Sequence, residues 1–555
     1  MNLRPWWTKS LNPCVTWNNC GSNFRLGHPP RFGFLLLAAW LASGAALVPV
    51  ASELAVRGGT LRLWYPTDWR SLDPAIAFDT DSVVLTKLLF RGLLDYDSQA
   101  RIVPDQARKW SVTSDGRTYS FELHPDARFS HGRVVEAEDY VFALERILDP
   151  KTGSPGQTYY LEIEGARDFA EGRATRVRGL EAADRFTLRI TLEKPSYTFR
   201  YVMAMSFASA LPRELVRKHG ADFQYHMAGS GPYRVTAWKR GVGWRLERNA
   251  HYFGSDGYVD AFDLMIGGDQ ALAAMMVERG DRDWANGGAV CGVSFLRDPA
   301  RRHLVERVRS VSIQYFFLNT ELKPFQDPRV RRAMNYAIDR ERLVKLAAGF
   351  GMVATGIVPS SMPWTNSTLP SYPLDRAAAK RLLEEAGYAD GFETEIYYIQ
   401  TRVPDVKAAQ SIQGDLAQVG IKVALKPLSQ PAFEVKARTR REVASGVWGW
   451  VQDYPDPSNF LDVLLSGKRI TDRDCNNLSF YGNRQVDDLL LKAEATLEGG
   501  ERQSLYQQAE RLMMLDAPWV PLMEEQYAIL KNPRVRGSPW HPVWLWRFEK
   551  VWLRN

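Results

Sequence analysis

The spacing of hydrophobic residues predicts that the first half of the chain is rich in strands. Over 60–65, 118–124 and 185–192, apolar and polar residues alternate, which is typical of half-buried β-strands. A glycine-containing turn at 229–235 leads into a further strand. Between the strands, residues 137–148 carry apolar residues at helical spacing. Short helices are therefore expected between the strands of this half.

The second half, from about residue 311, has longer helices whose ends are marked in the sequence. Asp327 followed by Pro328 is the signature of an N-cap and a first helical position. Asp375 and Gly387 enclose a second helix, since glycine readily takes the left-handed conformation that ends a helix. Both helices have apolar residues at helical spacing, so one face of each is expected to be core.

Strands alternate with these helices. A strand at 392–399 is followed by a helix that ends near Gly420, and 421–428 alternates as another strand. This order of elements is typical of an α/β domain. Near the end, two helices are stopped by Pro518, and a strand-rich tail follows from Val520. If this tail rejoins the first half, one domain is discontinuous.

The first 52 residues have the pattern of an export signal. Arg25 and Arg31 precede an uncharged run that starts at Phe32 and ends in small residues. The apolar part of this run, 32–48, is shorter than the about 20 residues that normally cross a bilayer. We therefore expect an exported protein with a leader at 1–52. An uncleaved leader that tethers the protein to a membrane is the alternative.

Composition limits the kind of partner. Without the leader, which holds four basic and no acidic residues, 67 basic residues face 64 acidic ones, a net charge of +3. No basic cluster is present, so a nucleic acid is not the expected partner. Only Cys291 and Cys475 lie outside the leader; they allow at most one disulfide, and two buried free thiols are the expected state. At 555 residues, the chain is long enough for two or three domains.

No common catalytic or metal-binding motif is present. The sequence lacks GxSxG, HExxH, a Walker loop ending in GKS or GKT, GxGxxG and CxxC. None of the eight histidines lies three or four residues from another, as a helix-borne metal pair requires. We therefore expect no catalytic residue, no metal and no cofactor. A pair of glycosidase carboxylates stays open, because carboxylates are plentiful.

Several stretches, taken in order, resemble one known family. They are GGTLRLWYPTDWRSLDPA, LLFRGLLDYD, GSGPYRVTAWKRG, FFLNTELKPFQDPRVRRAMNYAIDRERLV and WGWVQDYPDPSNFL, together with the long stretch 104–150. Their order and spacing are similar to those of the extracytoplasmic solute-binding proteins of ABC importers, family 5, which includes dipeptide-, oligopeptide- and nickel-binding members. The resemblance implies an α/β fold of the periplasmic-binding-protein type II class, with two large lobes joined by a hinge and an extra smaller domain.

The resemblance also implies where the domains lie. Residues 53–90, 200–310 and 520–555 are expected to form a discontinuous lobe I, residues 91–199 a small accessory domain, and residues 311–519 lobe II. The two lobes are expected to close on a ligand about their hinge. Such closure is a shift of population towards the shape that the ligand contacts better.

The stretch WGWVQDYPDP, 448–457, is the expected ligand site. In peptide-binding members of the family, an aspartate three residues after the tryptophan of a Gly-Trp pair meets the ammonium group of the peptide. Gly449 and Trp450 are that pair here, so Asp453 takes the position. A carboxylate in a closed cleft is stable when a cation pairs with it, which suits the role. The alternative is that Asp453 only folds the loop, because Asp-Tyr-Pro is also a turn former.

Other residues near this stretch have less specific roles. Trp448, Trp450 and Tyr454 are expected either to wall the cleft or to be core. Asp456 precedes a proline and an apolar run, so it is expected to cap a helix. Arg402 is the candidate for the peptide carboxylate, because dipeptide binders carry an arginine after the corresponding strand and a guanidinium group can grip two oxygens. A solvated surface arginine is the alternative.

The resemblance implies a periplasmic receptor that captures peptides or peptide-like solutes and delivers them to an ABC permease in the inner membrane. A monomer without enzymatic activity is expected. The alternatives are an exported hydrolase or glycan-binding protein, and a nickel-, haem- or opine-binding member of the same family.

Overall fold

The computed structural model describes residues 54–554, apart from positions 70, 287, 363, 365, 497, 498 and 538 and the side chains of 288–291. The fold described below lies within the unit Ala55–Asn555. The expected leader at 1–52 lies outside the described residues, as does the side chain of Cys291. Cys475 is a buried free thiol, as predicted. Within the described part, no helix combines the length and the hydropathy needed to cross a membrane.

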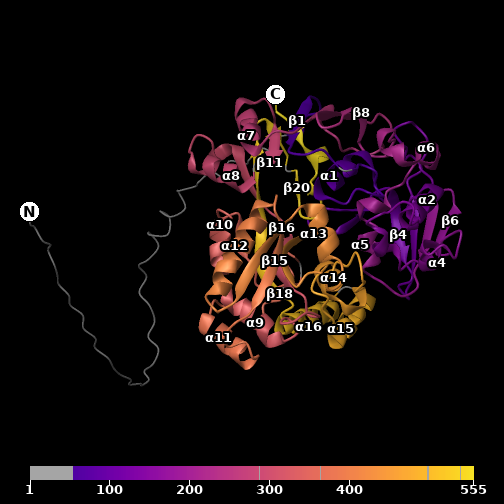
Figure 1. The fold of residues 1–555 in the computed structure, drawn as a ribbon. Coiled ribbons are helices and arrows are strands. Elements are labelled where there is room, and N and C mark those ends of the chain that lie inside the picture. The colour runs from indigo at the N-terminus through magenta and orange to yellow at the C-terminus, as the bar shows by residue number, and fades with distance from the viewer. Residues whose placement is uncertain are drawn as a thin grey trace, which may run out of the picture. The chain divides into compact units, whose positions relative to one another are not determined.

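One large mixed sheet runs through this unit (Figure 1). Its strands follow the order β16, β15, β17, β13, β18, β11, β1, β10, β9 and β8, and β12 and β14 pair with β18 beside this path. The bounds are β16 Lys422–Leu428, β15 Glu393–Ile399, β17 Ser445–Val451, β13 Ser312–Leu318, β18 Trp519–Lys531, β11 Trp284–Asn286, β1 Thr60–Tyr65, β10 Ala261–Ile266, β9 Gly243–Arg248, β8 Tyr233–Lys239, β12 Val305–Arg309 and β14 Gly351–Val353.

Strand β18 joins early and late parts of the chain. From Trp519 to Met523 it pairs antiparallel with β13, and from Ile529 to Lys531 it pairs antiparallel with β11. Strand β11 pairs in turn with β1, the first strand of the described chain. A single segment of 13 residues is therefore built into both halves of the sheet.

Helices surround the sheet, and several begin where the sequence predicts. Their bounds are α1 Thr80–Leu89, α2 Ala137–Leu148, α3 Gln157–Tyr160, α4 Ala166–Ala170, α5 Phe199–Val202, α6 Arg213–His219, α7 Gln270–Arg279, α8 Gly288–Arg297, α9 Pro328–Ala337, α10 Arg340–Leu346, α11 Arg376–Glu385, α12 Val403–Ala417, α13 Gln430–Ala437, α14 Ser458–Leu465, α15 Arg484–Ala495 and α16 Gly500–Asp516. The carboxylates of Asp327 and Asp375 cap α9 and α11 by accepting first-turn backbone N–H groups. The run after Pro328 breaks at Ile338, because Asp339 caps a separate helix, α10.

Strand β13 shows how helices cover both faces of the sheet. All seven of its residues are buried. Tyr315 and Phe317 pack with α13, α14, α15 and α16, whereas Phe316 and Leu318 pack with α9, α11 and α12. Successive side chains of a strand point to opposite faces, so each face has its own core. This layering is the α/β arrangement that the alternation of helices and strands predicts.

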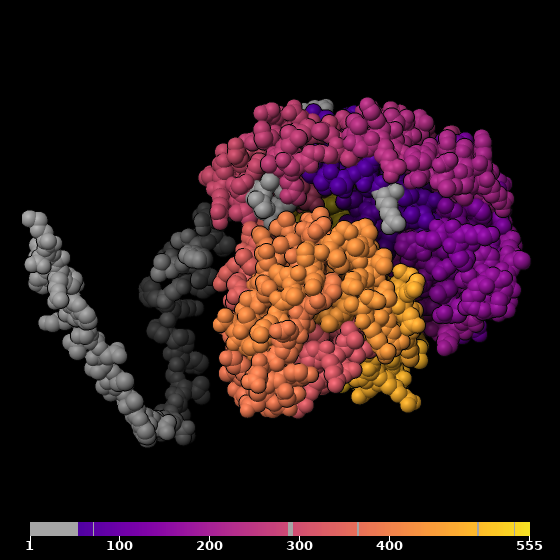
Figure 2. All heavy atoms as spheres, in the orientation of Figure 1, coloured from indigo at the N-terminus to yellow at the C-terminus, as the bar shows by residue number. Residues whose placement is uncertain are grey.

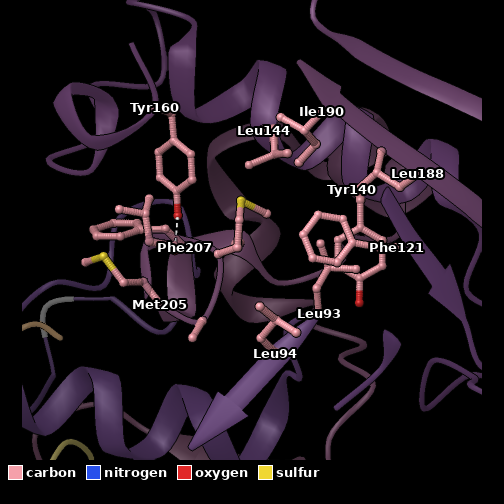
Figure 3. Close-up of a cluster of buried hydrophobic side chains, with 14 of the residues drawn as sticks. Leu93, Leu94, Phe121, Tyr140, Leu144, Tyr160, Leu188, Ile190, Met205 and Phe207 are labelled. Atoms are coloured by element: carbon pink, nitrogen blue, oxygen red, sulfur yellow. Dashed lines mark hydrogen bonds between the residues drawn. The ribbon is translucent and has the colours of Figure 1, made fainter. Parts of the chain in front are cut away.

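A smaller antiparallel sheet lies in the accessory segment, by which we mean residues 91–199. Its order is β4 (Ala107–Val112), β5 (Thr118–Leu123), β7 (Thr187–Thr191) and β6 (Leu180–Asp184). Helix α2 packs against it around Tyr140 and Leu144 (Figure 3). The hydroxyl of Tyr160 donates to the backbone oxygen of Val202 at 3.2 Å, so its polar end is satisfied inside this core. The core thereby fixes α3, whose next-to-last residue is Tyr159.

Short strands complete the fold. They are β2 Leu94–Tyr96, β3 Ile102–Pro104, β19 Val535–Arg536, β20 Trp540–His541, β21 Leu545–Trp546 and β22 Trp552–Leu553. The tail after β18 folds back on the first part of the chain, where Leu545 and Phe548 share a core with Leu61 of β1.

Candidate functional site

The two candidate charged residues follow neighbouring parallel strands. Asp453 comes after β17, and Arg402 comes after β15 and is the N-cap of α12. Strands β15 and β17 pair in parallel, with Tyr397 opposite Gly446. Because the carboxyl ends of parallel strands meet at the same edge of a sheet, both residues lie at that edge. Ligands of open α/β sheets commonly bind there.

Asp453 is held by hydrogen bonds from two distant parts of the chain. The hydroxyl of Tyr159, in α3, donates to Oδ2 of Asp453 at 2.7 Å, and Nδ2 of Asn459, in α14, donates to the same oxygen at 3.1 Å. Oδ1 of Asn459 accepts from the backbone N–H of Asp453 at 2.8 Å and from Nε1 of Trp450 at 3.1 Å. The loop after β17 is thus fixed, and its carboxylate meets the accessory segment.

The charge of Asp453 is not matched by a cation. Burial raises the pKa of Asp453 to about 6, and the hydrogen bonds from Tyr159 and Asn459 oppose only part of this rise. Among the described residues, no cationic side chain contributes to the pKa. A buried carboxylate is costly unless a positive charge pairs with it. An ammonium group from a ligand would supply that charge.

The aromatic residues of the predicted site are mostly buried. Trp448 stacks on Phe433 with 5.2 Å between ring centroids, and Tyr454 stacks on Tyr201 with 6.1 Å between centroids. Trp448, Trp450 and Tyr454 are 9%, 7% and 3% exposed. They therefore support the loop as core side chains and leave little of their surface for a ligand.

Arg402 lies beside Gly449. Its Nη2 atom is 3.5 Å from the position that a Cβ atom would take at Gly449, and its Cζ atom is 5.9 Å from the centroid of the Trp448 ring. One third of the Arg402 side chain is exposed. The structure thus brings Arg402 next to the strand that leads to Asp453, with its side chain partly exposed.

Two further residues of the site were missed from the sequence. Asp405, in the first turn of α12, is buried, lies 3.5 Å from Nε of Arg402 and accepts a hydrogen bond from Nε2 of Gln314 at 2.9 Å. Burial raises the pKa of Asp405 to about 6 although Arg402 opposes the rise. The spacing of three residues on one helix could have indicated this contact. Tyr159 lies 294 positions before Asp453 and carries no local signal.

A cavity of about 400 Å³ opens beside Arg402. It is lined by residues of α10, the first turn of α12 and β18, and Gln270 and Asn286 also line it. In Figure 2 the surface is hollowed between the orange part of the chain and the indigo and magenta part above it. The volume is in the range of small-molecule binding sites, which is about 300–1,000 Å³.

Asp456 has a structural role, with one correction to the prediction. Helix α14 begins at Ser458 and has Pro457 as its N-cap, one residue later than expected. Oδ1 of Asp456 still accepts the backbone N–H of Ser458 at 3.0 Å, and Oδ2 pairs with Arg502 at 2.6 Å. Both charged side chains are buried. This pair therefore anchors α16 to the loop that carries Asp453.

A known family model matches the part of the chain that contains this site. Residues 101–472 match the model described as bacterial extracellular solute-binding proteins, family 5, middle. The protein belongs to this family. The matched range of this family-5 protein includes Arg402, Asp453 and Tyr159. The family predicted from the sequence is thereby confirmed.

Relatives of this family-5 protein align with it over most of their length. The glutathione-binding protein GsiB of Salmonella typhi is 29% identical over 509 residues, which cover 90% of this chain and 95% of that protein. Among solved structures, the ABC transporter-associated periplasmic binding protein DppA of Helicobacter pylori, in complex with peptide STSA, has a TM-score of 0.78 and 28% identity over 90% of this chain and 99% of that one. Clavulanic acid biosynthesis oligopeptide binding protein 2 has a TM-score of 0.84 and 26% identity over 90% and 96% of the two chains. The predicted fold class, α/β and type II periplasmic-binding-protein-like, is confirmed.

Proposed function

We propose that this family-5 protein is the receptor of an ABC importer and captures short peptides, or peptide-like amines, outside the cytoplasm. The observation that carries the proposal is the carboxylate of Asp453 at the carboxyl edge of the parallel strands, which has hydrogen-bond donors but no cationic partner among the described residues. The glutathione-binding relative and the peptide-bound solved relative support the same class of ligand.

The ammonium group of the ligand would pair with Asp453. Within the described residues, both side-chain hydrogen bonds to Asp453 go to Oδ2, so Oδ1 is the oxygen that remains for the ligand. Tyr159 would then share the carboxylate with the ammonium group and connect the accessory segment to the bound ligand. Gly449, in β17, would border the site, and the buried side chains of Trp448, Trp450 and Tyr454 would support it from behind.

Arg402 would receive the carboxylate end of the ligand. Its fork can donate two hydrogen bonds to one carboxylate, and the start of α12 adds the favourable end of a helix dipole. Gly449 and Asp453 are four residues apart, so this part of the chain spans at most about 14 Å. A ligand that reaches both charged groups therefore has roughly two to four residues.

The division into lobes is part of the proposal. Lobe I would comprise 53–90, 200–310 and 520–555, the accessory domain 91–199, and lobe II 311–519. The separate four-stranded sheet supports the accessory domain, and β18, which pairs with strands of both lobes, supports a hinge between them. We propose closure about that hinge as the step that presents the ligand to a permease.

The proposal also implies a cellular location and a partner for the protein. The protein would work in the periplasm as a monomer, with its leader removed or kept as a membrane tether, and its partner would be a permease in the inner membrane. Neither a nucleic acid nor an enzymatic reaction has a place in this scheme. A nickel cargo is not favoured, since no three histidine, cysteine or acidic side chains among the described residues are grouped to hold a metal ion.

Calorimetry with matched peptides tests the proposal. A peptide with a free amino terminus should bind, and its N-acetylated form should bind far more weakly. Asp453→Asn should cost about 2–5 kcal/mol of binding free energy for the free peptide, because the ammonium group loses a desolvated partner. Asp126→Asn, at an exposed loop position, is the control and should leave the affinity unchanged.

Two results would count against the proposal. Equal affinity for the free and acetylated peptides, or an unchanged affinity in Asp453→Asn, would remove Asp453 from the site. Native mass spectrometry after incubation with a library of di- to tetrapeptides gives an independent readout. Release of cleaved products in that experiment would favour the exported hydrolase instead.

A further inference from the structure

The cavity beside Arg402 has an apolar wall. Leu346 and Ala347 line it from the end of α10 and Phe350 from the loop after that helix. Val403 lines it from the start of α12, and Met523 lines it from β18. Three separate segments therefore contribute hydrophobic side chains to one hollow of about 400 Å³. A polar ligand group would lose hydration against this wall without gaining hydrogen bonds in return.

Part of this wall is exposed to solvent. Leu346 is 39% exposed and Val403 is 56% exposed, and they come from the two helices that flank the cavity. Covering apolar surface is worth about 25 cal/mol per Å². An apolar group that enters the cavity would therefore gain free energy by covering both side chains.

The charges around the cavity balance each other. Arg402 and Lys407 line it as cations, Glu525 lines it as an anion, and Asp405 is buried beside Arg402. Nζ of Lys407 already donates to the backbone oxygen of Leu346 at 2.9 Å. No single sign of charge prevails, so the cavity has no electrostatic preference for an acidic or a basic side chain.

Arg402 connects this cavity to the ligand. In a peptide, the carboxylate carbon and the Cβ atom are both bonded to the last Cα atom, so they are only about 2.5 Å apart. If the carboxylate binds Arg402, the last side chain starts within a few ångströms of a residue that lines the cavity. The last side chain is therefore the part of the ligand best placed to enter the cavity.

We infer that the cavity receives the side chain of the ligand's carboxyl-terminal residue, and that the protein selects short peptides ending in a large aliphatic or aromatic residue. This inference rests on the proposed function, because it needs a carboxylate on Arg402. It adds a specificity that the charged ends of the ligand do not provide, since every peptide has an ammonium group and a carboxylate.

Titration calorimetry of chain 53–555 with the tripeptides Ala-Ala-Leu, Ala-Ala-Phe, Ala-Ala-Ala and Ala-Ala-Asp tests the inference. The peptides ending in Leu and Phe should bind about tenfold tighter than Ala-Ala-Ala or more, because burying a large apolar side chain contributes that much. Ala-Ala-Asp should be the weakest. Leu-Ala-Ala, which carries its leucine at the other end, should bind like Ala-Ala-Ala.

A variant that fills the cavity tests whether the cavity causes the preference for a large apolar carboxyl-terminal residue. Ala347→Trp fills the hollow from its half-buried position at the end of α10, so the ratio of the Leu to the Ala affinity should fall towards one. Ala386→Trp is the matched control, since Ala386 is a half-buried residue at the end of α11 outside the cavity. It should keep the ratio of the unmodified protein. Thermal unfolding checks that both variants fold.

The outcomes separate the inference from the proposed function. Equal affinities across the four tripeptides, or a preference that follows leucine at the first position, would overturn the inference and leave peptide capture intact. An unchanged ratio in folded Ala347→Trp would also overturn it. If none of the peptides binds, or acetylation of the amino terminus makes no difference, the proposed function falls and the inference falls with it.

Discussion

Asp453 and Asp456 share one loop but have different surroundings. Asp456 is paired with Arg502 at 2.6 Å, as a buried structural carboxylate usually is. Among the residues that the structure describes, the side chains that donate to the Asp453 carboxylate are the neutral Tyr159 and Asn459, and burial raises the pKa of Asp453 to about 6. A shifted pKa together with a missing partner is typical of a residue that serves a ligand.

The affinity for a peptide with a free amino terminus should rise with pH and level off above about pH 6. Burial raises the pKa of Asp453 to about 6, so below that pH the carboxyl group is protonated and must lose its proton before it pairs with an ammonium group. Each pH unit below the pKa should cost about tenfold in affinity. Calorimetry between pH 4.5 and 7 measures this slope. A flat profile over that range would exclude Asp453 as the partner of the ammonium group.

Gly449 should tolerate alanine but not a larger residue. A Cβ atom there would lie 3.5 Å from Nη2 of Arg402 and 3.5 Å from the backbone oxygen of Ile313, which are ordinary contacts. Gly449→Leu would push the guanidinium group of Arg402 aside. The affinity for peptides with a free carboxylate should then fall about tenfold, as expected for the loss of a charged hydrogen bond. Peptides with an amidated carboxyl end are the control, and equal losses for both kinds would contradict this prediction.

The contact between the accessory segment and the helices of the second half is rich in carboxylates. Arg469 pairs with Asp462 of α14 at 2.6 Å and lies 3.7 Å from Glu162, which follows α3. Glu494, at the end of α15, accepts a hydrogen bond from Ser196 at 3.3 Å. Burial, with a further contribution from Glu162, raises the pKa of Glu494 to about 8. Three carboxyl groups thus share one arginine where two parts of the chain meet.

This contact should weaken as the pH rises. The pKa of Glu494 is raised from 4.5 to about 8, so its folded environment favours the protonated form. The contribution of Glu494 to the free energy of unfolding is therefore fully present below pH 4.5, and it is lost progressively as the pH rises to about 8. The unfolding temperature should be lower at pH 9 than at pH 6. In Glu494→Gln this fall in unfolding temperature should be smaller by about 2–4 °C. An identical loss in Glu494→Gln would show that another group is responsible.

Binding of a ligand should increase the free energy of unfolding of the whole molecule. A ligand that binds only the folded chain adds about 2.7 kcal/mol at a free concentration of 100 times its Kd. The unfolding temperature should therefore rise with the concentration of a bound peptide and stay constant with its acetylated form. Small-angle scattering on the same samples should show a smaller radius of gyration when the lobes close. Superimposable curves with and without a bound peptide would argue against hinge closure.

Local signals in the sequence predicted the elements better than they predicted the site. Helix α2 forms with its expected bounds, and Asp327 and Asp375 cap α9 and α11, because these features depend on neighbouring residues. The position of Asp453 came from a resemblance, and its partner Tyr159 could not be predicted, since that contact depends on how the accessory segment docks. The cavity beside Arg402 likewise depends on three segments that are brought together only in the folded chain.

Strand β18 bears on the moment at which the chain can fold. Strands β11, β12, β13 and β14 all pair with Trp519–Lys531. Neither half of the large sheet is complete until synthesis has reached Lys531. A nascent polypeptide therefore cannot form the whole sheet while it is being made. A secretion channel that accepts only unfolded chains would meet little resistance from such a substrate. If the chain is exported unfolded, we expect β18 to complete both halves of the sheet only after transport.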